Sequence, residues 1–337
     1  MSSRSSAPPS RSGRKWLLAA LLLVVLATAW WALARAGHPG EASLADPAGA
    51  AYGESALGHL ERGYHAQGAG WQTARDELRR AGETAQTEAD LYGPIRAAIQ
   101  AAGGGHSHFF SPAEVAEYQK KGRNTFETPT VRTSGGVTEI RVPALGVVDV
   151  ARQEEYARAA ADRIDAAAPA TCGWIIDLRG NSGGNMYPML SGLTALLPNG
   201  EAMSFRDRHG DSTAVTVQSD GVGIGATETS VGTRAKVDSP LIAVLQDNYT
   251  ASAGEAVATA FLGLEGVRSF GVETAGLTSG NEAFSLPDGA ILNLTTSVYV
   301  DRTGRSLQER PIAPDERVVA NRADAEARRW LERQGCG

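Results

Sequence analysis

Short apolar runs that alternate with helical segments are the feature of this chain that most constrains its fold. Trp174–Leu178 (WIIDL) and Leu241–Leu245 (LIAVL) have the composition of buried strands. Strands joined through helices pair in parallel and are covered on both faces. The sequence therefore predicts an α/β fold, with α+β elements, around a largely parallel sheet. Further strands are expected at 137–142 and 267–272, helices at 152–168, 186–197, 253–264 and 323–333, and a hairpin at 283–286 and 290–300 about Asp288-Gly289.

The N-terminus contains a long apolar segment. Residues 16–34 (WLLAALLLVVLATAWWALA) carry no charge, and as a helix they would span roughly 28 Å, close to a bilayer core of about 30 Å. Arg4, Arg11, Arg14 and Lys15 precede the segment, which places residues 1–15 in the cytoplasm. We expect a single-pass membrane anchor with an extracytoplasmic body. The alternative is a cleaved signal peptide and secretion, since 34–36 (ARA) has the form of a cleavage site.

Five regions follow from these patterns. The cytoplasmic tail (1–15) and the anchor (16–34) precede a linker rich in Gly, Pro and Ala (35–52). A small helical N-terminal domain (53–104) has expected helices at 54–66, 71–81 and 88–102, and Gly103-Gly104-Gly105 ends the last of them. The remaining 105–337 form the core that contains the predicted sheet.

Composition excludes several classes of protein. The net charge is −6 and the body of the chain has no basic block, which argues against nucleic acid as a partner. Two cysteines exclude a disulfide scaffold and a four-Cys zinc site. Cys172, beside a buried strand, is expected to be an inert core residue, and Cys336, next to the last residue, to be exposed.

Two loops that follow predicted strands carry candidate functional groups. In 247–255 (DNYTASAGE), Ser252 would begin a helix, where its hydroxyl and the next backbone N–H are exposed. By itself this pattern is more typical of a plain helix cap. In 177–185 (DLRGNSGGN), glycines allow a close backbone approach and exposed N–H groups, although the same pattern is typical of a plain turn.

A third segment contributes imidazoles. Residues 105–110 (GHSHFF) hold His106 and His108, just past a helix end. A Ser nucleophile needs a base and an oxyanion hole, and the three segments together offer all of these groups. Two histidines could also bind a metal, but no carboxylate lies between 103 and 112, so neither a metal nor any other cofactor is expected.

With these three segments, the sequence resembles the C-terminal processing (tail-specific) serine peptidase family. DLRGNSGG resembles that family's DLRxNxGG loop, TASAGE its nucleophile turn TASAxE, 271–276 (GVETAG) its GxxTxG segment and 312–315 (IAPD) its terminal V/I-x-P-D. With the histidine segment, the blocks extend over 106–315 in the family's order. The resemblance implies a crotonase-like ββα core.

Departures from the family pattern point to one branch of it. The Ser–Lys peptidases of the family have Lys directly after GxxTxG, whereas this chain has Leu277. Gly105-His106-Ser107 instead resembles the GHS motif of the branch of the tricorn core and the nisin resistance protein, and 111–136 are too few residues for a PDZ module. In tricorn-like relatives a Glu supports the site six residues before the Pro of the PD motif. Gln308 has that position here, with Glu309 beside it, so a Ser–His dyad is expected.

The resemblance implies a membrane-anchored serine endopeptidase. Ser252 would be the nucleophile and His106 the general base, with His108 as the alternative base. The N–H groups of Ala253 and Gly184, or Gly183 as second choice, would form the oxyanion hole. Gln308 and Glu309 would support the site. Substrates would be small lantibiotic-like peptides or protein C-termini.

An imidazole pKa near 6.5 predicts that activity falls as His106 is protonated. The alternative functions are a non-catalytic peptide-binding protein on the same scaffold, a crotonase-like acyl enzyme and a metal hydrolase.

Overall fold

The computed structural model describes residues 48–336. The predicted cytoplasmic tail and anchor, and most of the linker, lie outside the described residues. Within 48–336, no helix combines the length and the apolar character needed to cross a bilayer.

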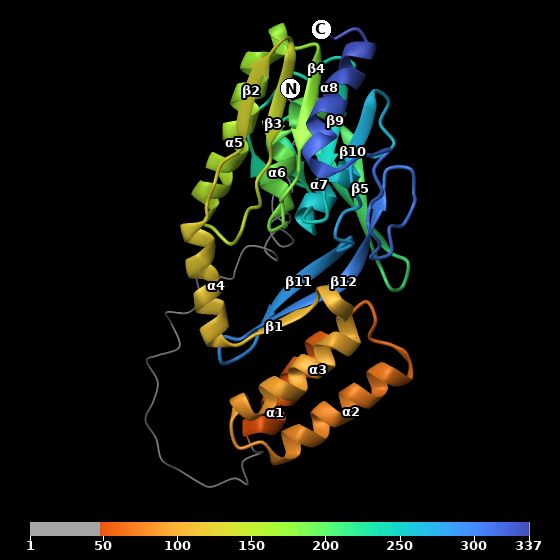
Figure 1. Ribbon diagram of the computed structural model, residues 1–337. Helices are drawn as coiled ribbons and strands as arrows, with labels where there is room; N and C mark the ends of the chain where they lie inside the picture. The colour runs from red at the N-terminus through yellow and green to blue at the C-terminus, as the bar shows by residue number, and fades with distance from the viewer. Residues whose placement is uncertain (1–47, 337) are drawn as a thin grey trace, which may run out of the picture. The chain divides into compact units, whose positions relative to one another are not determined.

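Three helices form in the predicted N-terminal region, but the first begins and ends six residues earlier than the predicted 54–66, so 48–52 belong to this helix and not to the linker. They are α1 (Ala48–Leu60), α2 (Gly68–Thr84) and α3 (Tyr92–Gly103), the last preceded by the short helix η1 (Glu88–Leu91). Leu57 and Ile95 from these helices share one core cluster with Leu292 and Leu294 of strand β12 (Ile291–Asp301). The helices therefore pack directly on the sheet that contains β12 (Figure 1). The predicted domain boundary at 104/105 stays a prediction.

The central sheet is largely parallel, as predicted. Its strands have the order β13-β10-β9-β4-β3-β2, and only the edge pair β2/β3 is antiparallel. The bounds are β2 Thr130–Ser134, β3 Val137–Arg141, β4 Gly173–Asp177, β9 Leu241–Gln246, β10 Val267–Gly271 and β13 Glu316–Arg317.

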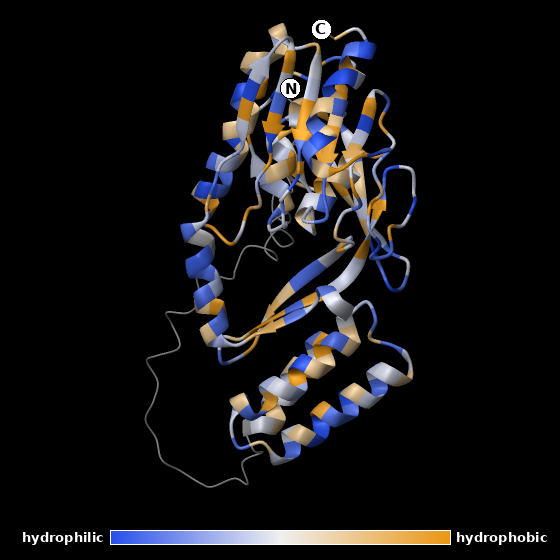
Figure 2. Ribbon diagram, in the orientation of Figure 1, coloured by the Kyte–Doolittle hydropathy of each residue, from blue (hydrophilic) through white to orange (hydrophobic). Residues whose placement is uncertain are grey.

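Helices cover both faces of this sheet, which explains the apolar runs WIIDL and LIAVL. Trp174 and Ile176 pack against helices α5–α7, whereas Ile175 between them packs against α8. Figure 2 shows the resulting concentration of hydrophobic residues along the central strands. The helices are α4 Pro112–Asn124, α5 Val150–Ala167, α6 Met186–Gly192, α7 Ala253–Phe261 and α8 Ala323–Arg333, with short helices η2 Gly104–His106, η3 Ala168–Ala170, η4 Thr194–Leu196 and η5 Ala320–Arg322.

A second, antiparallel sheet was only partly predicted. The hairpin of β11 (Ser279–Ser285) and β12 about Asp288-Gly289 is confirmed. Four strands between 200 and 230 were not predicted, although Val215 and Val217 of one of them are buried and alternate with polar residues, which is the period-2 pattern of a strand. The sheet has the order β1-β12-β5-β6-β7-β8, with β11 also paired to β12. The remaining bounds are β1 His108–Phe110, β5 Gly200–Asp207, β6 Ser212–Gln218, β7 Gly221–Gly223 and β8 Thr229–Ser230.

The two cysteines form a disulfide, and the expectation of two unpaired cysteines was wrong. Cys172 and Cys336 are bonded across a sequence separation of 164 residues, with their Cα atoms 5.3 Å apart. Their environments are also reversed, since Cys336 is buried and Cys172 is exposed. Helix α8 packs against β4 and β9 and returns the end of the chain to the start of β4, a proximity that spacing in the sequence does not reveal.

Candidate functional site

Ser252 lies between strand β9 and helix α7, as the sequence predicts. It is the N-cap of α7 and adopts a left-handed φ of +50°, which is unfavourable for a residue with a Cβ. Its backbone N–H donates to the Glu255 carboxylate at 2.9 Å. The strained turn is therefore held by the helix that it begins, and strain of this kind is typical of functional sites.

Glu255 is the residue of this turn that sequence reasoning left without a role. Its side chain is fully buried, and its carboxylate also accepts hydrogen bonds from the Thr274 hydroxyl and, at 2.8 Å, from the Gly276 N–H. Burial raises the pKa of Glu255, while these hydrogen bonds lower it. The carboxylate thereby fastens the Ser252 turn to 274–276. The signal in the sequence was an acid three residues after an N-cap, which is the capping-box spacing.

The glycine loop lies against Ser252. A Cβ added to Gly183 would come within 2.8 Å of the Ser252 Cβ and 3.3 Å of the Ala253 nitrogen. The Gly183 N–H already donates to Asn181 Oδ1 at 3.0 Å. Within 48–336, by contrast, the N–H groups of Gly184 and Ala253 donate to no protein acceptor. Two free donors thus lie next to the Gly183–Ser252 contact in the sequence, one on each segment.

His106 lies at the end of η2 and makes one side-chain hydrogen bond in the described part of the chain. Its Nδ1 is 2.9 Å from the Ser279 Oγ at the start of β11. Burial and, to a smaller extent, the nearby His108 lower the pKa of His106 to about 4. The expected pKa near 6.5 is therefore wrong, because that value is the one of a solvated imidazole.

His106 and Ser252 are linked through the β11–β12 hairpin rather than directly. No hydrogen bond joins the two side chains among the residues that the structure describes. Ser252 instead lies near the buried Tyr299 of β12: burial raises the pKa of Tyr299 above its usual range, and the Ser252 side chain acts to lower it. The Tyr299 N–H in turn donates to the Thr278 carbonyl, next to Ser279. One hairpin thus contacts both predicted catalytic side chains.

The other predicted residues lie beside the site. His108 is exposed, and its Nδ1 is 3.1 Å from the His106 carbonyl oxygen. The carboxylate of Glu309 is 2.6 Å from Nε2 of His65, and Gln308 is exposed. Neither residue hydrogen-bonds His106 in the described chain, so their supporting role stays a prediction.

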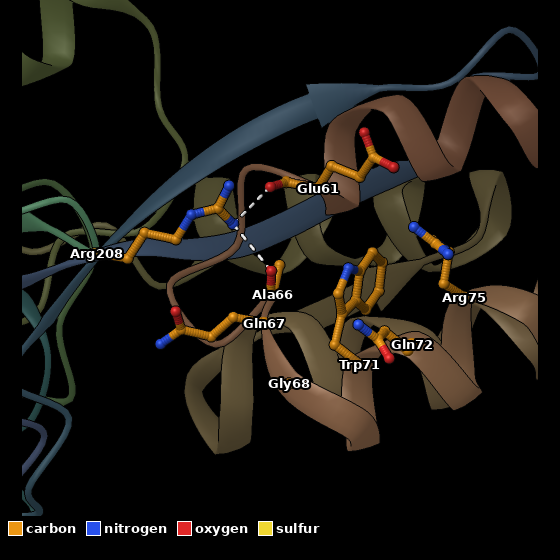
Figure 3. A pocket seen from close by; sticks show the side chains of 8 residues that line it. All are labelled: Glu61, Ala66, Gln67, Gly68, Trp71, Gln72, Arg75 and Arg208. Atoms are coloured by element: carbon orange, nitrogen blue, oxygen red, sulfur yellow. Dashed lines mark hydrogen bonds between the residues drawn. The ribbon is translucent and has the colours of Figure 1, made fainter.

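Two further features bear on what the chain could bind. Within 48–336, no group of three or more His, Cys, Asp or Glu side chains is arranged to hold a metal ion. An open groove of about 400 Å³ lies beside Trp71, and none of the predicted site residues lines it (Figure 3). There Arg208 donates to the carbonyls of Glu61 and Ala66, so this arginine fixes the α1–α2 loop.

Comparisons with known proteins agree with these features. The chain is 31% identical over 240 residues to the nisin-resistance protein of Lactococcus lactis subsp. lactis, which covers 71% of this chain and 73% of that protein. A lipoprotein from Streptococcus agalactiae superposes with a TM-score of 0.76 at 29% identity, over 88% of this chain and 100% of that one. The photosystem II D1 C-terminal processing protease, at 13% identity, shares the fold, with a TM-score of 0.55 over 81% of this chain and 94% of its own.

A family match defines the core of the chain. Residues 139–318, more than half of the sequence, match the model of the family described as "Peptidase family S41". The match includes Ser252 and the glycine loop, whereas His106 precedes it. The chain belongs to peptidase family S41.

Proposed function

We propose that this chain is a membrane-anchored, extracytoplasmic serine endopeptidase that acts through an acyl-enzyme on Ser252. The observation that carries the proposal is the strained Ser252 turn beside two backbone N–H groups, of Gly184 and Ala253, that donate to no acceptor in the described chain. Such donors stabilise the oxyanion of an acyl-transfer transition state. A helix cap alone requires neither the strain nor the adjacent glycine loop.

In the proposed reaction, Ser252 Oγ bonds to the substrate carbonyl carbon while its proton passes to Nε2 of His106. The carbonyl oxygen becomes an oxyanion, which accepts from the Gly184 and Ala253 N–H groups. Collapse of this intermediate breaks the C–N bond, and His106 gives its proton to the leaving amine. Water then hydrolyses the ester, with His106 again the base. His106 must approach Ser252 for this step, and substrate binding beside the β11–β12 hairpin is proposed to bring them together.

The location and the substrate are part of the same proposal. The uncharged segment 16–34 with basic residues before it supports an anchor with an outer body, and the Cys172–Cys336 disulfide supports an oxidising compartment. The likeness to a nisin-resistance protein supports small lantibiotic-like peptides as substrates.

A fluorophosphonate probe tests the nucleophile directly. We expect covalent labelling of the wild-type chain at Ser252, no labelling of Ser252→Ala, and loss of peptide cleavage by at least about a thousandfold in that variant. Full activity of folded Ser252→Ala would overturn the proposal. His106→Ala should lose cleavage as severely, whereas His108→Ala should be milder. The reverse order would make His108 the base.

A second candidate function is non-catalytic peptide binding on the same scaffold. The absence of a hydrogen bond between His106 and Ser252 in the described chain favours it. The same probe decides between the two functions, because a binding protein would take up peptide without labelling or cleavage.

A further inference from the structure

Ser279 is the group that faces the imidazole of His106. Its hydroxyl lies 2.9 Å from Nδ1, and its side chain is 1% exposed, so water does not compete for this contact. The backbone here is fixed by the sheet, because Ser279 pairs with Val298 in the β11–β12 ladder. From the other side, the Asn281 side chain donates to the His106 carbonyl at 2.9 Å. Both the ring and the backbone of His106 are thus bound to β11.

A histidine base at this position needs a hydrogen-bond acceptor for the N–H of its second ring nitrogen. Once the imidazole has taken a proton, both of its nitrogens are donors, and Nδ1–H of this half-buried ring points at the buried Ser279, where it needs an acceptor. Serine proteases commonly use a carboxylate there, which also stabilises the positive ring. In this chain Glu309 is bound to His65, and the described structure offers Nδ1 no other partner than Ser279.

We propose that Ser279 is the positioning residue of His106, accepting a hydrogen bond from Nδ1–H and leaving Nε2 as the unprotonated base. The inference rests on the proposed function, and it assigns a neutral third member to the site where an acid would be expected. A hydroxyl fixes the tautomer and the orientation of the ring as a carboxylate does, but it adds no negative charge to stabilise the imidazolium. Such a site has a base that stays neutral into the acidic range and a lower maximal rate.

Few charged or titratable side chains lie near the ring of His106. His108 is close enough to disfavour a positive charge on its ring. The His65–Glu309 pair lies beside Gly104, two residues before His106, and holds one acid and one base. A carboxylate introduced at 279 would therefore dominate the electrostatics of the ring.

Three substitutions at one position test the role. Ser279→Ala should lower kcat about tenfold with KM little changed, as expected for the loss of one neutral hydrogen bond in the transition state. Ser279→Thr keeps the hydroxyl and should restore most of the rate. Ser279→Asp should move the acid limb of the kcat profile upward by at least about one pH unit, which a merely structural residue would not do. Ser285→Ala, an exposed serine of the same strand, is the matched control and should change nothing.

A second measurement is independent of turnover. In Ser252→Ala, nitrogen NMR of the His106 ring should report a protonated Nδ1 and a bare Nε2 at neutral pH, and Ser279→Ala should abolish that preference. An unchanged kcat and pH profile in folded Ser279→Ala, or a ring protonated at Nε2, would overturn the inference. If the wild-type chain neither cleaves peptides nor reacts with the fluorophosphonate, the proposed function fails, whatever the NMR shows about Ser279.

Discussion

The imidazole of His106 shows how burial changes a residue whose identity alone suggests a pH switch. A solvated histidine titrates near pH 6.5, whereas the pKa of His106 is lowered to about 4 by burial and by His108. A base is active when neutral, so a lower pKa extends activity to lower pH. We expect peptide cleavage to be flat between about pH 5 and 8 and to fall only near pH 4.

The pH profile of kcat/KM is the measurement, because it reports the pKa of the free enzyme, with circular dichroism at each pH to show that the chain stays folded. Removing the neighbouring charge in His108→Gln should move the acid limb slightly upward. A limb centred near pH 6.5 in the wild-type chain would contradict the burial of the reacting imidazole.

Glu255 gives a stability prediction at the same scale. Its buried carboxylate satisfies the N–H groups of Ser252 and Gly276 and the hydroxyl of Thr274. Glu255→Ala would leave these buried donors without an acceptor, each costing about 1–3 kcal/mol. We expect urea denaturation to show a loss of about 3 kcal/mol or more in the free energy of unfolding.

Glu255→Gln is the informative companion, because it keeps one acceptor oxygen and should lose less. A loss under about 1 kcal/mol in Glu255→Ala would mean that water replaces the carboxylate.

The residues around Ser252 and His106 also show which parts of the site could be predicted from the sequence. The position of the Ser252 turn after a strand was predicted from its motif, whereas Ser279, 173 positions away from His106, is recognised only once β11 lies beside η2.

At the scale of elements, the close packing of the glycine loop explains why position 184 requires glycine. Gly184 has a φ of +116°, and a Cβ there would lie 1.7 Å from the Leu145 carbonyl oxygen. Gly184→Ala must therefore displace the loop and the N–H that it presents. We expect kcat to fall by about 10²–10³, the usual effect of losing one oxyanion donor, together with a lower Tm.

Gly180→Ala is the control within the same loop. Gly180 also has a left-handed φ, +75°, but no atom lies within 4 Å of an added Cβ. This variant should show the conformational cost alone, about 1–2 kcal/mol, with kcat nearly intact. Equal losses of kcat in the two variants would remove the steric argument for Gly184.

Elements with a continuous apolar run were predicted, and those whose buried residues are few or separated by polar ones were not. The strands at 174–178 and 241–245 are apolar because helices cover both faces of their sheet. Helix α4 buries almost nothing, so no periodicity predicts it, although Ser111 and Glu114 form a capping box that would have located its start. Strand β6 buries Val215 and Val217 between polar residues, so its sequence does contain the alternation of a strand, but without the continuous apolar run on which the other strands were recognised.

At the scale of the molecule, strand β12 connects the N-terminal helices to the core that contains Ser252. Its Leu292 and Leu294 pack in the cluster of α1–α3, while Tyr299, further along the same strand, packs in the cluster around α5–α7. Helices α1–α3 therefore cover the apolar face of the same strand that, further along, lies near Ser252. A truncation at 104 would expose this apolar face of β12, so every measurement proposed above uses a chain that includes α1–α3.

The disulfide is expected to affect the stability of the whole chain, and it lies away from the proposed active site. Cys172 precedes β4, at the opposite end of that strand from the glycine loop that follows Asp177. Closing so long a loop restricts the unfolded chain, so Cys172→Ser with Cys336→Ser should lower the free energy of unfolding by roughly 3–5 kcal/mol. Activity at 25 °C should be unchanged, because α8 still packs Trp330 and Leu331 on the sheet. Wild-type chain treated with a reductant is the control and should match the double variant in Tm. Loss of cleavage in a variant that is still folded would show that the C-terminal helix is coupled to the site through the sheet.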